Sequence, residues 1–70
     1  MIYNRKIDLL ERRKAKVFCA NGETYIGFGN IPCLGSDKNG EDVDGILFTA
    51  DDGKDIIFIE DDIEKIEFLD

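Results

Sequence analysis

The sequence predicts a mostly-β fold: a small five-stranded barrel over about residues 15–69, behind an N-terminal helix over about residues 4–14. Three observations support this prediction. The first residues have helical spacing and no Gly or Pro. From residue 15 the apolar residues alternate with a period of two, and Asn-Gly and Asp-Gly turns separate short apolar runs. A chain of 70 residues makes one small domain with a marginal core, so self-association is an expected source of extra stability.

The expected helix has an apolar stripe and a basic side. Asn4 is an acceptable N-cap, and Tyr3, Ile7 and Leu10 fall on one face. Leu9 lies on the opposite side, where it is a candidate contact with another subunit. Basic residues surround it there and form a candidate surface for RNA or a protein partner: Arg5, Lys6, Arg12 and Arg13.

The first hairpin is predicted from the Asn21-Gly22 pair, because Asn-Gly between two β-patterned runs is a strong turn signal. The following strand, over residues 23–29, is expected to turn Thr24, Ile26 and Phe28 to one face. Phe18 and Tyr25 then stand side by side on the other face. Such an aromatic pair either stacks bases or seats a peptide, or it packs under the helix or at a subunit edge. Four phenylalanines fit the core register: Phe28, Phe48, Phe58 and Phe68.

The second half of the chain contains three more predicted strands, over residues 46–50, 54–60 and 63–69. Residues 30–45 show no regular pattern and are expected to form a long connection, either functional or partly mobile. The run Ile56–Ile59 is apolar on both faces, which indicates that something covers its outer side. The helix and a neighbouring subunit are both candidates, so Ile57 and Ile59 join Leu9 as possible subunit-interface residues.

The charge is divided unevenly along the chain. Residues 1–22 carry six basic and two acidic groups, a balance of +4, whereas residues 23–70 carry three basic and fourteen acidic groups, a balance of −11. An acidic body repels nucleic acid at long range, so RNA is expected to meet only the basic N-terminal part. Alternatively, the basic part neutralises a neighbouring acidic surface.

Several function classes are disfavoured by composition. The chain has no His, which excludes Ser–His and Cys–His nucleophile pairs, and we expect no catalytic residue, cofactor or metal site. The acidic loop from Asp37 places Asp42 where an EF-hand requires Gly, so the calcium template fails. The charged N-terminus predicts no signal peptide and no apolar run predicts a membrane span. We therefore expect a cytoplasmic protein with two reduced cysteines, Cys19 and Cys33.

Two segments resemble the Sm and Sm-like family of SH3-like barrels. The run VFCANGETYIGF is similar to the family's strand, Asn/Asp-Gly turn and glycine-bent strand, and IFIEDDIEKIEF is similar to its closing pair of strands. The resemblance covers about residues 4–69. It implies a ring of subunits joined edge to edge through the fourth and fifth strands, which would cover the apolar run at Ile56–Ile59.

The RNA-contact motifs of the family are absent. RNA-binding members carry an Asp-x-x-Met-Asn-like element between their second and third strands, which residues 30–45 do not reproduce. Where those members have Arg-Gly or Lys-containing pairs, this chain has Glu60-Asp61, and no residue is carried over as an RNA ligand. The leading expectation is therefore a non-enzymatic interaction and assembly module that self-associates and docks a protein partner. The alternative is an Sm-like RNA-binding ring that uses the basic helix.

Overall fold

The computed structural model describes residues 5–70, which form one five-stranded antiparallel sheet with a short helix before it. The order of strands across the sheet is β4-β3-β2-β1-β5. The elements along the chain are α1 (Lys6–Leu9), β1 (Lys14–Cys19), β2 (Thr24–Ser36), β3 (Asp42–Ala50), β4 (Asp55–Ile59), the 3₁₀ turn η1 (Glu60–Asp62) and β5 (Ile63–Phe68). The prediction of a mostly-β fold with five strands is confirmed.

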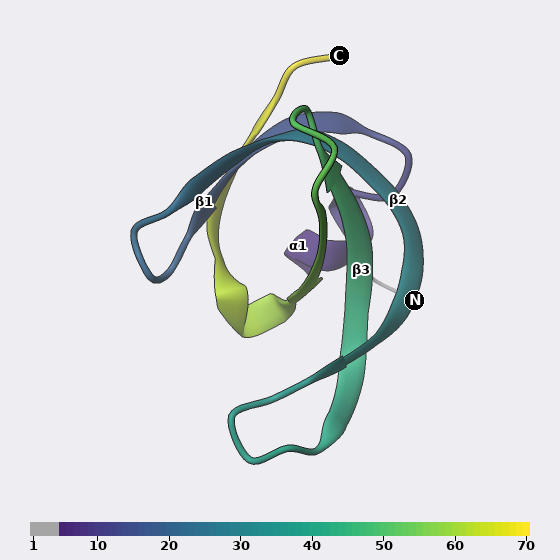
Figure 1. Cartoon of the computed structure of the whole chain (residues 1–70), viewed down its shortest axis with the longest axis vertical. Helices are drawn as coiled ribbons and strands as arrows, with labels where there is room; N and C mark the ends of the chain where they lie inside the picture. The colour runs from purple at the N-terminus through teal and green to yellow at the C-terminus, as the bar shows by residue number, and fades with distance from the viewer. Residues whose placement is uncertain (1–4) are drawn as a thin grey trace.

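The sheet curls strongly but does not close into a barrel. Figure 1 shows the strands bent round a central space, with β4 and β5 joined by η1. These two strands are the edges of the sheet, and each pairs with a neighbour on one side only: β4 with β3, and β5 with β1. The closed barrel expected from the sequence is therefore not observed, because β4 and β5 do not pair with each other.

The N-terminal helix is much shorter than predicted. It covers only Lys6–Leu9, and Arg12 has a left-handed backbone with φ of 59° that sends the chain back along β2. The backbone N–H of Arg12 donates to Gly29 O at 2.7 Å, and Gly29 N–H donates to Arg13 O at 2.9 Å. Pairing with β2 thus replaces the last turn of the predicted helix. A short helix has little intrinsic stability, so these backbone hydrogen bonds to β2 are enough to end it. The proposed N-cap Asn4 and the apolar residue Tyr3 lie outside the described residues.

The turn between β1 and β2 has one residue more than the Asn-Gly signal suggests. Cys19 N–H donates to Glu23 O at 2.8 Å, so Ala20, Asn21 and Gly22 form a three-residue loop, with Gly22 at φ of 93°. Three-residue loops that end on a left-handed Gly are a common hairpin class. The extra residue shifts the pairing by one.

A shift of one residue turns every side chain of a strand to its other face. Phe18 therefore pairs with Thr24, and Val17 pairs with Tyr25. The predicted side-by-side placement of Phe18 and Tyr25 is wrong, and so is the core position of Phe28, whose surface is 43% exposed. Tyr25 instead belongs to the inner face, where it packs against the core.

Residues 30–45 are not an irregular connection but the far end of a long β2–β3 hairpin. Pairing resumes at Pro32–Ile46 after a register shift beyond Gly29, and it continues to Ser36–Asp42. The carboxylate of Asp37 closes the hairpin by accepting from the N–H groups of Asn39 and Glu41, at 2.8 and 3.0 Å. The turn also contains Gly40 at φ of 81°.

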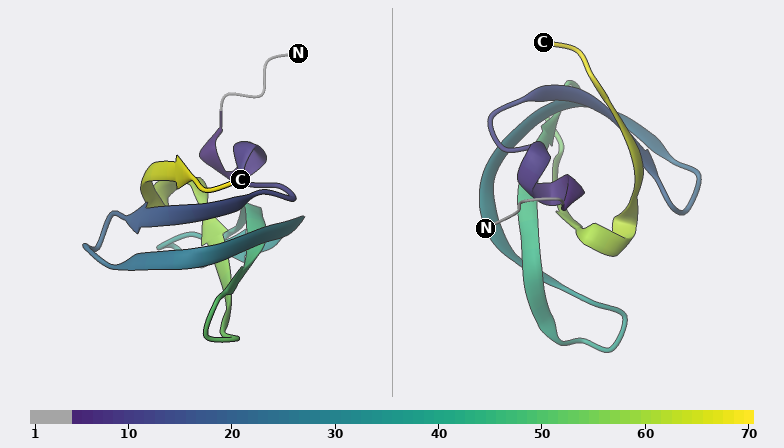
Figure 2. Two further views of the ribbon diagram at one scale, coloured as in Figure 1. Left: turned by 90° about the horizontal axis from the view of Figure 1, so that it is seen from above. Right: turned by 180° about the vertical axis from the view of Figure 1, so that it is seen from behind.

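The core lies inside the curl, and α1 lies over one end of it (Figure 2). Ile7 and Leu10 enter the core from this end and are buried in the same cluster as Phe48. The close approach depends on Gly29, where a Cβ atom would lie 2.0 Å from Leu10 O. Similarly, a Cβ atom on Gly27 would lie 2.1 Å from Thr49 O, so bent β2 needs glycine at both positions.

Candidate functional site

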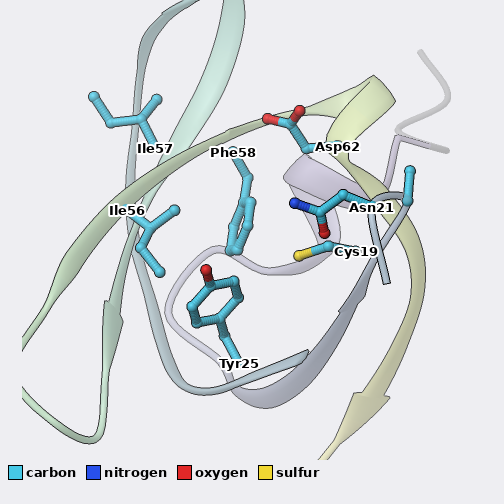
Figure 3. Close-up of a pocket in the computed structure, with 8 residues that line it drawn as sticks. Cys19, Asn21, Tyr25, Ile56, Ile57, Phe58 and Asp62 are labelled. Atoms are coloured by element: carbon cyan, nitrogen blue, oxygen red, sulfur yellow. The ribbon is translucent and has the colours of Figure 1, made fainter. Parts of the chain in front are cut away.

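A pocket of about 320 Å³ opens between strand β4 and the β1–β2 turn, and we call it the seam pocket. It lies near η1, on the side where the two edge strands are not paired. In Figure 3 the side chains of Cys19, Tyr25 and Phe58 point toward one another. The residues that line the pocket are Cys19, Ala20, Asn21, Tyr25, Ile56, Ile57, Phe58 and Asp62.

Two aromatic rings form the inner wall of the seam pocket. The ring centroids of Tyr25 and Phe58 are 6.0 Å apart and the rings are tilted by 57°, a preferred geometry for an aromatic pair. Phe58 in turn packs against Phe48, with centroids 5.3 Å apart, so the wall is continuous with the core. The core therefore gives this wall a rigid support.

Two acidic groups lie at the pocket: Asp62 in its lining, and Glu23 next to Tyr25. The Tyr25 hydroxyl donates to the carboxylate of Glu23, and this hydrogen bond is the main reason that the pKa of Tyr25 is raised above 10.0. Burial raises the pKa of the Cys19 thiol, with further contributions from Asp62 and Glu23. A protonated Cys19 is a weak nucleophile, so these groups favour binding rather than thiol chemistry at this site.

Backbone contacts bring distant parts of the chain together at the pocket. Ala20 N–H donates to Asp62 O at 2.9 Å, which ties the β1–β2 turn to η1. The carboxylate of Asp62 accepts from Ile59 N–H at 3.0 Å and closes the turn after β4. Sequence reasoning missed Asn21, Phe58 and Asp62 as members of one site, because only the curl of the sheet makes them neighbours.

The three residues predicted at a subunit interface have different surroundings. Leu9 is 47% exposed on α1, and Ile57 is 49% exposed on the edge strand β4. Ile59 is only 8% exposed. Its methyl group occupies space over Gly35, where a Cβ atom would lie 2.5 Å from it. The chain's own β2–β3 hairpin thus covers Ile59 and part of Ile57, and about half of the surface of Leu9 and Ile57 stays exposed.

Three of the four basic residues predicted to contact a partner are engaged by carboxylates. Arg5 donates to Asp8 and Asp44, at 2.8 and 2.7 Å, and these hydrogen bonds raise the pKa of its guanidinium. The Lys6 ammonium lies 3.6 Å from the Glu60 carboxylate. A basic side chain that is already paired with a carboxylate offers less net positive charge to a phosphate group of RNA.

Arg13 and Arg12 complete the basic set. The Arg13 guanidinium donates twice to Asp70, at 2.7 and 2.9 Å, and it lies 4.1 Å above the ring of Phe68. This bond to Arg13 lowers the pKa of the Asp70 carboxyl below 3.8. Arg12 forms no ion pair with residues 5–70.

Phe18 lies on the outer face of β1, away from Tyr25. The ammonium groups of Lys16 and Lys65 lie 5.2 and 5.4 Å from the centroid of its ring. On β2, next to β1, Ile26 and Phe28 are also exposed on this face. The structure therefore separates the predicted aromatic pair into one outer residue and one residue of the seam pocket.

Two other features of residues 5–70 bear on the kind of site. No group of three or more His, Cys, Asp or Glu side chains in this range is arranged to hold a metal ion. No helix in this range is long and apolar enough to cross a membrane.

Comparison with known proteins adds no relative. The chain matches no protein-family model, no curated protein and no solved structure.

Proposed function

We propose that this protein is a non-catalytic interaction and assembly module, and that copies of it associate through the edge of strand β4. The observation that carries the proposal is the exposed Ile57 on a strand that is paired on one side only. An edge strand offers unpaired N–H and C=O groups to another chain, and natural proteins usually block such an edge with a charge or a covering element. The centre of β4 carries no charged residue, and within residues 5–70 Ile57 stays 49% exposed.

The simplest partner for β4 is β5 of a second copy. Both strands are edges of the same sheet, and neither pairs with the other within the chain. Pairing β4 of one copy with β5 of the next is a head-to-tail arrangement, which closes into a ring when the rotation between copies allows it. This is the arrangement that the resemblance to Sm-like proteins implies. It would join the open sheets of neighbouring copies edge to edge into one continuous sheet.

The proposal is tested by light scattering coupled to size-exclusion chromatography over a series of protein concentrations. We expect the wild type to elute at a multiple of the 7.9 kDa chain mass. Ile57→Lys places a charge at the centre of the β4 edge and should weaken association at least about tenfold, equivalent to about 1.4 kcal/mol.

The matched control is Ile31→Lys. Ile31 is 55% exposed on β2, which does not pair with β4 or β5, so the substitution makes the same chemical change at a similarly exposed isoleucine outside the proposed interface. We expect this variant to keep the wild-type mass. A wild type that stays monomeric at high micromolar concentration would refute the proposal. Equal dissociation of both variants would refute the assignment of the interface to β4.

The charges favour a protein partner over RNA. Arg5, Lys6 and Arg13 are already paired with carboxylates, and the net charge of −7 repels a polyanion. The role of the module is therefore to dock a second protein.

A further inference from the structure

The seam pocket joins an aromatic wall to an acidic rim. Tyr25 and Phe58 supply the wall, and the Asp62 carboxylate is part of the lining. Glu23 is hydrogen-bonded to the Tyr25 hydroxyl. No residue that lines the pocket is basic. The pocket therefore has unbalanced negative charge next to two aromatic side chains.

The ion pairs of residues 5–70 lie elsewhere. Their basic members are Arg5, Lys6 and Arg13, which are held by carboxylates of α1, β3, η1 and the C-terminus. The charges of Asp62 and Glu23 are thus not neutralised by an ion pair within this range. Asp52 adds to the same negative environment, since it contributes to the raised pKa of Tyr25.

A cation next to a Tyr or Phe ring is attracted by the electron-rich face of the ring when it lies within about 6 Å of the centroid. Carboxylates at the rim add a direct charge interaction with the same cation. A volume of about 320 Å³ corresponds to roughly ten water molecules, which is ample for one long side chain. The apolar stem of a lysine or arginine can contact Ile56 and Phe58 while its charged end reaches the rim.

We propose that the seam pocket binds a lysine or arginine side chain of a basic segment in a partner protein. The net charge of −7 attracts such a segment at long range, and the pocket supplies the local contact. This inference names the partner class of the proposed interaction module and rests on that role. It does not rest on self-association through β4.

The test is a titration of the full-length ¹⁵N-labelled protein with two matched peptides, followed by amide chemical shifts. One peptide alternates Lys with Ser, and the other alternates Glu with Ser. We expect the Lys peptide to cause saturable shifts at Asn21, Tyr25 and Phe58, and the Glu peptide to cause none. Shifts by the Glu peptide, by a single-stranded oligonucleotide at the same residues, or by the Lys peptide only at the outer face of β1 would overturn the proposal.

A pair of neighbouring substitutions separates the pocket from general charge attraction. Asp62→Asn and Asp61→Asn each remove one negative charge, but only Asp62 lines the pocket. The amide introduced by Asp62→Asn retains an oxygen that can accept from Ile59 N–H, so the turn is preserved. We expect Asp62→Asn to weaken binding of the Lys peptide at least about fivefold, as loss of a charge-assisted contact does, and Asp61→Asn to change it less than about twofold. Equal weakening by both variants would overturn the pocket assignment.

The aromatic wall is tested by Tyr25→Leu, which keeps an apolar side chain but removes the ring. We expect binding about threefold weaker, as for the loss of one cation–π contact. Unchanged affinity in a folded variant would show that the ring does not contact the ligand and would overturn this part. The oligomer mass is measured on the same samples. If the protein is a monomer and binds the Lys peptide, only the self-association proposal is refuted. If it is an oligomer and binds neither peptide, only the pocket proposal is refuted.

Discussion

The carboxylate of Glu60 accepts a hydrogen bond from the backbone N–H of Ile7, at 3.1 Å, across 53 residues of sequence. The same carboxylate accepts from Lys6 N–H at 3.0 Å. These are N–H groups at the start of α1, which have no partner within the helix. Glu60 begins η1, so one side chain fastens the helix to the turn between the two edge strands.

We predict that Glu60→Ala lowers the free energy of unfolding by about 2 kcal/mol, the usual range for partly buried hydrogen bonds to a charged group. The measurement is urea denaturation followed by circular dichroism. Glu64→Ala is the control, because Glu64 is exposed on β5 and should cost at most about 0.5 kcal/mol. Equal losses in the two variants would show that Glu60 does not hold α1 in place.

Gly29 is predicted to tolerate no side chain. A Cβ atom there would lie 2.0 Å from Leu10 O, and this neighbour is backbone that cannot rotate away. Gly29→Ala should cost about 3 kcal/mol, at the upper end of overpacking effects, or prevent folding. Gly53→Ala is the comparison, since Gly53 has open space around it but a φ of 91°. It should cost only about 1 kcal/mol. If Gly29→Ala proved the milder of the two in a thermal melt, the close contact with Leu10 would be refuted.

Tyr25 is predicted to hold its proton above pH 10. The hydrogen bond to Glu23 and, to a lesser extent, burial favour the protonated hydroxyl and so raise its pKa. The resulting contribution to folding stability is fully present below the ordinary pKa of 10.0 and is lost as the pH rises through the raised value. Titration of tyrosinate absorbance in a Tyr3→Phe background reads this single group.

Glu23→Gln in the same background should lower the pKa of Tyr25 toward 10, because it removes the negative acceptor. Glu67→Gln, on the outer face opposite Lys16, should leave the titration curve unchanged. An unaltered curve in Glu23→Gln would mean that Glu23 does not accept this hydrogen bond in solution.

The two cysteines should differ sharply in reactivity. Cys19 is 6% exposed and its thiol pKa is raised by burial, whereas Cys33 is only partly buried on β2. We expect a thiol-specific reagent to modify Cys33 rapidly and Cys19 only at the rate at which the fold opens. Cys33→Ser should therefore abolish the fast phase and retain the slow one. Persistence of a fast phase in that variant would show that the seam pocket admits the reagent to Cys19.

The local patterns determined which segments become strands and where several turns fall. Alternation through Val17 and the apolar run at Ile56–Ile59 correctly predicted β1 and β4, since strand formation depends on the spacing of apolar residues. The pair Asn39-Gly40 has the same turn signal as Asn21-Gly22. This pair would have predicted the long β2–β3 hairpin in the segment that was expected to be irregular.

Only the tertiary structure decided the register, the length of the helix and the composition of the seam pocket. One additional turn residue, Ala20, reverses the faces of β2, and both registers leave apolar side chains on either face. Pairing of Arg13 with Gly29 ends the helix, although the local sequence continues its pattern. Asp62 meets the β1–β2 turn only because the sheet curls. The sequence by itself thus determined the elements through short-range patterns, and their mutual placement followed from long-range contacts that such patterns do not encode.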